Sequence, residues 1–365
     1  MTDRFAALHT VGSGSYAPAD VHFLLRHMRL DATDVEEKER LIQSGQRHYS
    51  EMISAEQAPD AVHSALYQQA LTQNGRRMAA DVQALAEGLH QACDGEPIAL
   101  VSFVRAGLPL GVLLRRALVE KGREAHHYGV SIIRDRGIDR VALRAIVEAH
   151  GARNIVFVDG WTGKGAISGE LARTLRDEPG FEHPPRLVVL ADPCGQAWLA
   201  ASAEDWIIPS GILGATVSGL VSRSIWPAEG GLHGCVRYDH LHPHDVTRSF
   251  IEHIEIERAT LGPVAAAQPW GDARKAELQA AARAVVERLA SLHGIGNYNR
   301  IKPGIAEATR AVLRRVPERV LVRDRRDPDV QLLMHLTERA SVVVEDAGDA
   351  LGPYRAVTII RGIGQ

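Results

Sequence analysis

The stretch that most constrains the fold is an apolar run at 155–158 that ends on an acid and a glycine-rich loop. The run predicts a buried strand of a parallel sheet. Asp159 ends the strand, and a helix is expected to begin near Ala166. Backbone N–H groups and the helix dipole converge at such a junction, so the sequence predicts an anion-binding site there. The loop between the strand and the helix contains Gly160, Thr162, Gly163, Lys164 and Gly165.

This loop is not a P-loop. That motif has four residues between its first Gly and its Gly-Lys pair, followed by Ser or Thr, whereas Gly163-Lys164 is followed by Gly165. The pattern resembles instead the loop of type I phosphoribosyltransferases that binds 5-phosphoribosyl-1-pyrophosphate (PRPP). In that family the acid contacts the ribose and the Thr-Gly loop holds the 5-phosphate. Gly160 replaces the second acid of the family pattern. The alternative is an ordinary tight connection between a strand and a helix.

A second unit of the same kind precedes the first. Residues 98–104 predict a buried strand, Arg105-Ala106-Gly107 forms the loop, and a helix follows from Leu110 to Lys121. The order resembles the diphosphate loop of the same transferases, in which a guanidinium and backbone N–H groups hold the diphosphate. Arg134 and Arg136 stand where that family has a mobile loop, and the resemblance implies that they bind phosphate. A solvated charged turn is the alternative.

The alternation of apolar strands with helices predicts an α/β fold with a parallel sheet, of the type I phosphoribosyltransferase kind. This domain is expected to span residues 1–265, with a mostly helical part at 1–95. A Pro-, Ala- and Gly-rich stretch at 260–271 is typical of a linker. Residues 272–365 predict a small α/β sandwich. The part from Trp270 onward has a net charge of +4 (16 Lys and Arg against 12 Asp and Glu), and the remainder has −7.

The start of this sandwich, Lys302-Pro303-Gly304 followed by a helix, resembles the helix start of the pelota/L7Ae RNA-binding fold. The family pattern is Lys-Gly-x-Asn-Glu-x-x-Lys, and Ala306 replaces its base-contacting Asn. The resemblance implies RNA binding, in which phosphates would be contacted. The residues implied are Lys302, Gly304, Glu307 and Arg310.

Composition and charge limit the class of protein. The net charge of −3 gives no general nucleic-acid or membrane signature, and no apolar run approaches the length of a membrane span. The N-terminus lacks a signal-peptide pattern. Three widely spaced cysteines indicate a reducing compartment, so a cytoplasmic protein is expected. The histidines between His233 and His244 fit no common zinc motif, so no protein-held metal is expected.

Over nearly its whole length the chain looks like the phosphoribosyltransferase family of bacterial tellurite-resistance and stress gene clusters, some members of which have the label "cysteine protease StiP". The motifs include the loops above and His48-Tyr49-Ser50-Glu51-Met52. The resemblance implies a Mg²⁺-dependent transferase that moves ribose phosphate from PRPP to a nucleobase-like or RNA-linked acceptor, and it allows a homodimer.

The expected roles follow from this resemblance. Asp159, Arg105 and Lys164 would be catalytic. PRPP would be bound by Ala106, Gly107, Gly160, Thr162, Gly163, Gly165, Arg134 and Arg136. The side of the acceptor would be formed by His48, Glu51, Asp192, Ser210 and Gly211.

Two other functions stay open on the sequence. In a cysteine protease, Cys194 would be the nucleophile, with His48 or a histidine between His233 and His244 as the base. In a non-catalytic sensor, PRPP or a nucleotide would be bound and coupled to RNA, which would explain the missing second acid at Gly160.

Overall fold

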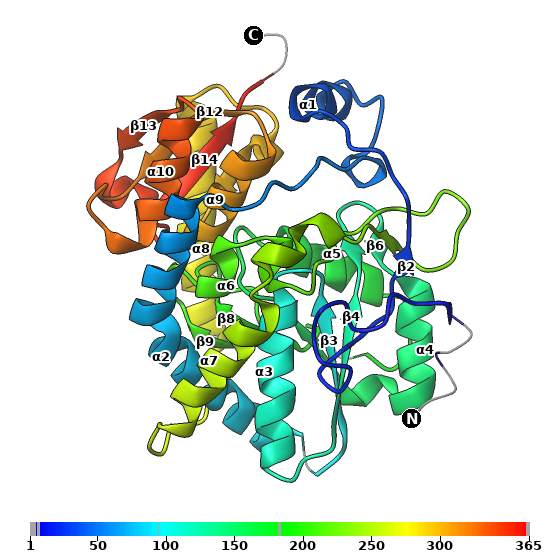
Figure 1. Cartoon of the computed structure of the whole chain (residues 1–365). Helices are drawn as coiled ribbons and strands as arrows, with labels where there is room; N and C mark the ends of the chain where they lie inside the picture. The colour runs from blue at the N-terminus through cyan, green and yellow to red at the C-terminus, as the bar shows by residue number, and fades with distance from the viewer. Residues whose placement is uncertain (1–4, 6–7, 94, 182–183, 363–365) are drawn as a thin grey trace.

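Two sheets organise the chain in the computed structural model, which describes residue 5 and residues 8–93, 95–181 and 184–362 (Figure 1). The larger, six-stranded sheet has the order β1-β4-β3-β7-β8-β9, and all of its pairings are parallel. The mixed α/β fold with a parallel sheet is therefore confirmed. The strands are β1 (His22–Phe23), β3 (Ile98–Phe103), β4 (Ala125–Val130), β7 (Ile155–Val158), β8 (Leu187–Ala191) and β9 (Leu199–Ser202).

The central strands are apolar on both faces because each face is covered by helices. In β3, Leu100 belongs to one buried cluster, whereas Ala99 and Val101 belong to another. Successive side chains of a strand point to opposite faces, so this alternation separates two cores. The first core includes residues of α2 (Ala61–Ala92), α3 (Gly107–Glu120) and α7 (Thr247–Ala259), and the second includes residues of α4 (Arg140–His150) and α5 (Ala166–Leu175).

The connections reverse direction between β3 and β7, which are neighbours in the sheet. From β3 the chain passes through α3 to β4 on one side, and it later returns to β7 on the other side of β3. Ligands of open parallel sheets bind at such a switch point, outside the carboxyl ends of the strands. The loops after β3 and β7 therefore meet at the edge where a ligand site is expected.

The first 95 residues differ from the mostly helical expectation. The helices α1 (Val35–Gln43) and α2 lie there, but β1 adds a parallel edge strand beside β4. The buried side chains of Val21, Phe23 and Leu25 explain this pairing, because they enter the core only when this segment lies along the sheet. A second short strand, β2 (Arg26–His27), pairs with β10 (Gly234–Cys235).

The C-terminal module, defined here as residues 272–362, contains the second sheet, of four strands in the order β11-β14-β12-β13. Only β12 and β13 pair in parallel. The module begins with α8, and two shorter helices connect its strands. Its elements are α8 (Asp272–Leu292), β11 (Ile301–Pro303), α9 (Ile305–Arg314), β12 (Pro317–Val322), α10 (Gln331–Arg339), β13 (Val343–Asp346) and β14 (Ala356–Ile360).

The module is fixed to the carboxyl edge of the large sheet. Ile305 and Ala306 at the start of α9 belong to the same apolar cluster as Trp161, which follows β7. The buried Asp205 accepts hydrogen bonds from the backbone N–H of Ile305 at 3.0 Å and of Arg355 at 2.8 Å. Apolar packing and charge-assisted hydrogen bonds together hold the two units face to face.

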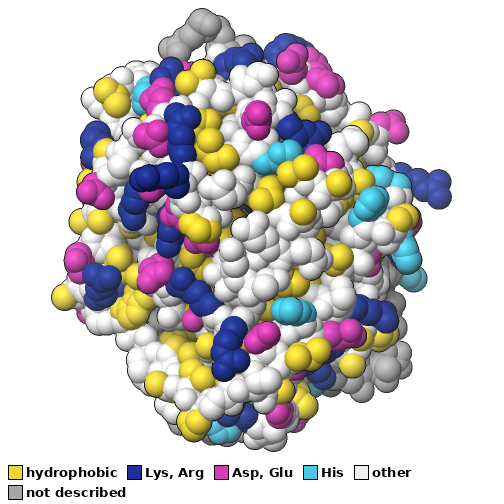
Figure 2. All heavy atoms as spheres, turned by 60° about the vertical axis from the view of Figure 1, so that its left-hand side comes forward, with side chains coloured by type: hydrophobic (Ala, Val, Ile, Leu, Met, Phe, Trp, Pro, Cys, Tyr) yellow, Lys and Arg dark blue, Asp and Glu magenta, His cyan; other side chains and the backbone are white. Residues whose placement is uncertain are grey.

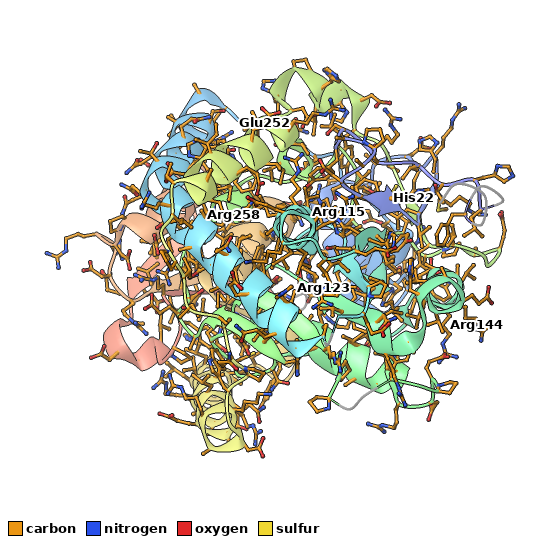
Figure 3. The ribbon with its side chains drawn as sticks, turned by 90° about the horizontal axis from the view of Figure 1, so that it is seen from below. His22, Arg115, Arg123, Arg144, Glu252 and Arg258 are labelled. Atoms are coloured by element: carbon orange, nitrogen blue, oxygen red, sulfur yellow. The ribbon has the colours of Figure 1, made fainter. Side chains whose placement is uncertain are left out.

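The side of the molecule seen in Figure 3, where Arg123 and Arg258 are labelled, has polar contacts between helices. Arg258 pairs with Glu255 at 3.1 Å and with Glu120. Arg123 donates to the carbonyls of His90 at 2.8 Å and Glu96 at 3.2 Å. These side chains tie α2, α3 and α7 to one another.

Within the described ranges, every helix is too short or too polar to cross a membrane.

The crossing of the loops after β3 and β7 depends on glycine. A Cβ at Gly107 would lie 2.2 Å from the carbonyl oxygen of Val158. We expect Gly107→Ala to lower the free energy of unfolding by about 1–3 kcal/mol, because the backbone must move apart. The matched control is Gly169→Ala in α5, where nothing lies within 4 Å of the added Cβ. That change should stabilise the protein by about 0.5–1 kcal/mol in urea unfolding. Equal effects of the two substitutions would contradict this account.

Candidate functional site

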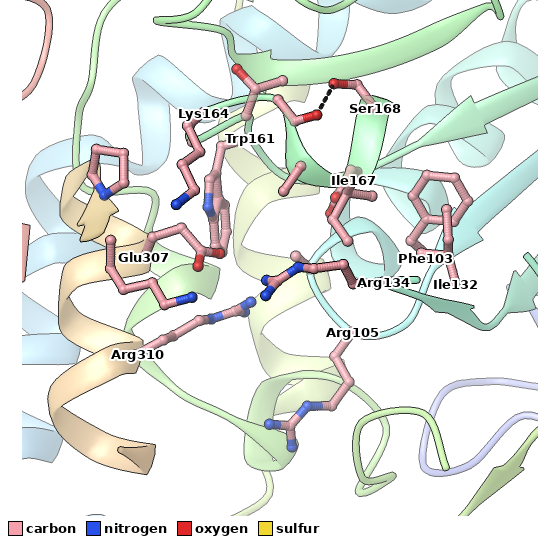
Figure 4. A pocket seen from close by; sticks show the side chains of 18 of the residues that line it. Phe103, Arg105, Ile132, Arg134, Trp161, Lys164, Ile167, Ser168, Glu307 and Arg310 are labelled. Carbon is pink, nitrogen blue, oxygen red and sulfur yellow. Dashed lines mark hydrogen bonds between the residues drawn. The ribbon is translucent and has the colours of Figure 1, made fainter. Parts of the chain in front are cut away.

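A pocket of about 280 Å³, called here the interdomain pocket, lies where the carboxyl edge meets the C-terminal module. Its walls are the loop after β3 (104–106), the loop after β7 and start of α5 (159–168), and residues of β11 and α9. Figure 4 shows side chains from these segments pointing into one space. The volume is close to the lower end of the range for small-molecule sites.

Positive charge dominates the lining. Of the described residues, six basic side chains line the pocket against two acidic ones, Asp159 and Glu307. Since like charges repel, this excess favours an anionic ligand that would neutralise part of it. The basic residues are Arg105, Arg134, Lys164, Lys302, Arg310 and Arg314.

Two of these arginines have hydrogen-bonding capacity to spare. Arg310 stacks on Trp161, with its guanidinium carbon 4.5 Å from the ring centroid, and its buried Nε has no hydrogen-bond partner. Arg134 also has a buried Nε without a partner, and its Nη1 is 3.4 Å from the Asn299 side chain. Figure 4 shows the ends of Arg134 and Arg310 pointing toward one another across the pocket. Unsatisfied buried donors are costly, so both groups favour an acceptor between them.

Crowding of the cations shows in their pKa values. Burial, and then Arg134, lower the pKa of Lys164 to about 8 and of Lys302 to about 7. Burial, and then Arg105, lower the pKa of Arg314 to about 9. A bound anion would oppose each of these effects, because it favours the charged form of a base.

Asp159 lies at the end of β7, among the basic side chains that line the interdomain pocket. Its Oδ1 accepts a hydrogen bond from the Gly160 N–H at 2.8 Å. Burial raises the pKa of the Asp159 carboxyl to about 7. The group is therefore poised between its neutral and ionised forms near neutral pH.

The loop glycines serve packing more than ligand approach. A Cβ at Gly160 would lie 2.9 Å from the Ala106 carbonyl oxygen, so Gly107 and Gly160 both let the two loops cross. A Cβ at Gly163 would lie 3.3 Å from the Pro303 carbonyl oxygen of the C-terminal module. Gly165 begins α5 with a φ of 83°, a conformation that suits glycine.

Three of the residues expected to act on PRPP are already engaged within the protein. Lys164 donates to the carbonyls of Tyr298 and Ile301, the latter at 2.9 Å, and so ties the loop to the C-terminal module. The Thr162 hydroxyl donates to the buried Asp192. Arg105 lines the pocket, but its Nη1 donates to Glu56 at 2.7 Å. Of the expected phosphate ligands, Arg134 is the one least committed elsewhere.

Other expected residues lie outside the pocket lining. Arg136 pairs with Glu51, and its guanidinium carbon is 4.8 Å from the Trp226 ring centroid. His48 Nδ1 is 2.7 Å from Ser50 Oγ. Asp192 accepts from the N–H groups of Gln196 and Ala197, and the buried Ser210 and Gly211 belong to α6 (Pro209–Ile212). In the structure these residues contact other parts of the protein and do not line the interdomain pocket.

The expected RNA-binding residues face inward. Lys302, Glu307 and Arg310 line the interdomain pocket, and Lys302 is only 8% exposed. Gly304 lies against Asp205. On the face shown in Figure 2, Lys and Arg side chains are interspersed with Asp and Glu, so that face has no broad surface of one charge.

Cys194, the expected protease nucleophile, lies directly behind the pocket wall. Its Sγ is 3.2 Å from the Thr162 hydroxyl oxygen, and Thr162 lines the pocket. The thiol is 2% exposed and shares an apolar cluster with Ala282 and Tyr354 of the C-terminal module. Burial, and then the charge of Asp192, raise the pKa of the Cys194 thiol. The group is a protonated thiol in this conformation.

Three of the histidines expected as its base have contacts elsewhere. His48 contacts Ser50, His233 Nδ1 lies 2.6 Å from Ser131 Oγ, and His240 Nε2 lies 3.1 Å from the Glu56 carbonyl oxygen. A thiolate nucleophile needs a nearby base or cation. The structure does not join Cys194 to any of these three imidazoles.

Sequence reasoning assigned no role to two residues that shape the pocket, Tyr49 and Trp161, whereas Arg314 was expected beside Arg310 as a phosphate contact. Tyr49 follows His48 in a motif already noted, and Trp161 lies inside the phosphate-type loop, so their positions were visible but their role was not. Arg314 lies one helical turn after Arg310 in α9, a spacing that places both on one face. Among the described residues, no group of three or more His, Cys, Asp and Glu side chains is arranged to hold a metal ion.

Comparisons with known proteins give two family matches. Residues 14–255 match the family described as "Tellurite-like stress resistance cysteine protease StiP". Residues 280–362 match the PELOTA RNA-binding domain. A curated relative, the cysteine protease StiP of Acinetobacter baylyi (strain ATCC 33305 / BD413 / ADP1), is 51% identical over 366 residues, which cover 97% of this chain and 95% of the relative.

Solved structures give weaker likenesses. The hypoxanthine phosphoribosyltransferase of Trypanosoma cruzi is 13% identical over 36% of this chain and 77% of its own, with a TM-score of 0.26. A hypothetical protein from Neisseria gonorrhoeae with bound ppGpp is 17% identical over 37% of this chain and 81% of its own, also at 0.26. Scores this low support no conclusion about fold or function.

The expectation of a phosphoribosyltransferase is wrong by these findings. The family and the 51%-identical relative are both named as a cysteine protease, which is a hydrolase and not a pentosyl transferase. The physical reason for the error is that a strand, an acid and a Thr-Gly loop predict an anion site but not the reaction performed there. The links to stress resistance and to an RNA-binding module are confirmed.

The pKa values predict how anion binding depends on pH. As pH rises from 6 to 9, Asp159 gains a negative charge, and Lys302 and Lys164 lose their positive charges. We expect sulfate to bind the pocket on the order of tenfold more weakly at pH 9 than at pH 6, measured by calorimetry.

Asp159→Asn is the control for this dependence. It removes one titrating group, so the pH dependence should become shallower and binding at pH 8.5 tighter. Binding that is independent of pH in the wild type would contradict the assignment.

Proposed function

The chain belongs to the StiP family of tellurite-like stress resistance proteins, and we propose that it acts there by binding a phosphate-bearing ligand of the nucleotide type in the interdomain pocket. The observation that supports this most is the convergence of six basic side chains from both units on one cavity. Phosphate groups are the biological anions best matched to several arginines, because guanidinium groups donate in a fixed fork.

The aromatic residues suit the rest of such a ligand. Trp161 and Tyr49 line the same pocket, with Arg310 stacked on Trp161 and Arg134 5.9 Å from the Tyr49 ring centroid. A planar base has π faces that stack on aromatic rings and on guanidinium planes. The pocket thus offers both kinds of contact that a nucleotide needs.

Mg²⁺ fits this proposal as a companion of the phosphates. Asp159 and Glu307 are the carboxylates of the lining, which is too few to enclose the ion alone. Mg²⁺ keeps several waters and binds through one or two carboxylates together with phosphate oxygens. We propose that Asp159 contacts the hydrated ion, which would neutralise phosphate charge.

The proposed ligand would share its residues with an RNA bound to the C-terminal module. The pelota-type residues that line the pocket, Lys302, Glu307 and Arg310, are the same ones expected to contact RNA. Phosphate contacts position a nucleic acid on its protein. A ligand in the interdomain pocket and an RNA on these residues would therefore compete, so that binding of the ligand would weaken binding of the RNA.

The test is calorimetric titration of the whole chain with AMP and with adenosine in the presence of Mg²⁺. AMP should bind at least about tenfold more tightly than adenosine, because the arginines act on the phosphate. Arg310→Met should remove most AMP binding. Arg310→Lys, which keeps the charge, should bind AMP more tightly than Arg310→Met but more weakly than the wild type.

The control variant is Arg326→Met. It removes the same charge from a side chain that is 91% exposed on the module surface, and it should bind AMP as the wild type does. Equal binding of AMP and adenosine, or full AMP binding by Arg310→Met, would rule the proposal out.

A second candidate is peptide hydrolysis, favoured by the name of the 51%-identical relative. Cys194 is its best nucleophile, because its thiol contacts a residue of the pocket wall. Attack by sulfur on a peptide carbonyl needs the thiolate, and the thiol is buried against the C-terminal module. Cleavage would therefore require the module to move away from Cys194.

Peptidase activity on unfolded casein tests this candidate. Cys194→Ala should abolish cleavage, while Cys235→Ala, which changes a buried cysteine of β10, should leave it intact. If the wild type cleaves no peptide bond, or if Cys194→Ala cleaves normally, Cys194 is not a protease nucleophile.

A further inference from the structure

A second cavity, called here the side pocket, lies next to the interdomain pocket and has a volume of about 370 Å³. It is bounded by the start of α1, the segment 53–60, the loop around Leu213, and helices α9 and α10. Arg105 and Arg314 line both cavities, so the two are neighbours. None of the residues expected from the sequence to bind RNA lines the side pocket.

Much of the lining is apolar. Six Val, Ile and Leu side chains contribute, from both the α/β part and the C-terminal module. A ligand with a hydrocarbon body would bury its surface against them, which is favourable at roughly 25 cal/mol per Å². These residues are Val35, Ile53, Leu213, Val312, Leu313 and Leu336.

The polar part of the lining is positively charged, and one of its hydrogen-bond donors has no acceptor. Arg223 donates through Nη2 to the carbonyls of Tyr49 and Met52, but its buried Nη1 has no hydrogen-bond partner. Lys38 is 5% exposed and donates to Ser54 Oγ at 2.5 Å. A buried guanidinium N–H without an acceptor is costly, so its place in a cavity wall indicates a missing acceptor.

The acids of the lining are engaged elsewhere. Glu56 accepts from Arg105 at 2.7 Å and from the Ala215 N–H. Asp60 caps α2 by accepting from the His63 N–H at 2.7 Å, and it also pairs with Arg339. Neither carboxylate is bonded to Lys38 or Arg223. Burial, followed by the charge of Arg223, lowers the pKa of Lys38 to about 7, which agrees with uncompensated positive charge.

We propose that the side pocket is a second binding site that holds a medium-chain carboxylate, its apolar chain against the aliphatic wall and its carboxylate on Lys38 and Arg223 Nη1. A carboxylate offers two acceptor oxygens, and one planar group can therefore serve both donors. The aliphatic lining makes the side pocket chemically different from the interdomain pocket. The interdomain pocket has the aromatic side chains of Tyr49 and Trp161 for its nucleotide-type ligand.

The experiment is calorimetric titration of the full chain with octanoate, octylamine and acetate. Octanoate should bind at one site per chain. Octylamine has the same chain with the opposite charge, and acetate has the head group without the chain, so both should bind at least about tenfold more weakly. Equal binding of octanoate and octylamine would show a non-specific apolar surface and overturn the proposal.

Two variants locate the site. Lys38→Met matches the apolar stem of the side chain but removes the ammonium, and it should weaken octanoate binding at least about fivefold. Leu313→Asp places a negative charge on a side chain that is 41% exposed at the cavity wall, so it should repel octanoate without disturbing the core. Unchanged octanoate binding by both variants would overturn the proposal.

Arg310→Met separates this site from the interdomain pocket. It should leave octanoate binding intact, because Arg310 lines only the interdomain pocket of the two. Loss of octanoate binding in Arg310→Met would place the carboxylate in the interdomain pocket and refute the side pocket as its site. Arg326→Met again serves as the control for a surface charge.

Discussion

Enclosure of positive charge between the two units is the constraint on which the rest of the structure depends. The carboxyl edge of the parallel sheet contributes Arg105 and Arg134, and the C-terminal module contributes Arg310 and Arg314. These groups would repel one another in a closed cavity, so partial neutralisation is needed. Glu56 supplies part of it by pairing with Arg105, while the lowered pKa of Arg314 shows that positive charge remains in excess. Apolar packing of Ile305 and Ala306 beside Trp161, and the hydrogen bonds of Asp205, hold the units together against this repulsion.

This docking decides which functional groups are accessible. It turns the pelota-type residues Lys302 and Arg310 toward the α/β part, and it places Cys194 in the apolar cluster of the module. An RNA, a phosphate-bearing ligand and a peptide substrate would all meet the same interface. A change in the position of the module would therefore affect all three together, since each depends on groups that the module covers. The part that matches the stress-resistance family (14–255) and the part that matches the PELOTA RNA-binding domain (280–362) meet at this interface.

The transferase expectation failed for an instructive reason. Asp159, the glycine loop and the start of α5 form a strand-to-helix junction of a kind that favours anions in general, and reactions as different as hydrolysis and group transfer are built on such junctions. The structure also commits several of the expected ligands to structural contacts: Lys164 to carbonyls of the module, Thr162 to Asp192, and Arg136 to Glu51. These residues support an anion pocket.

The sequence by itself determined the central strands and helices of the large sheet, although not its edge strand β1. Apolar runs such as 155–158 specify buried parallel strands because both faces are covered, and the strand at 155–158 was predicted to end at Asp159, as it does. It also indicated a separate C-terminal module, through a Pro- and Gly-rich stretch and a helix start at Lys302. Only the tertiary structure decided that the module closes over the carboxyl edge, that Arg314 and Trp161 meet in one cavity, and that Cys194 is buried behind it. Contacts between residues far apart in the chain depend on how two surfaces fit, and local pattern holds no information about that fit.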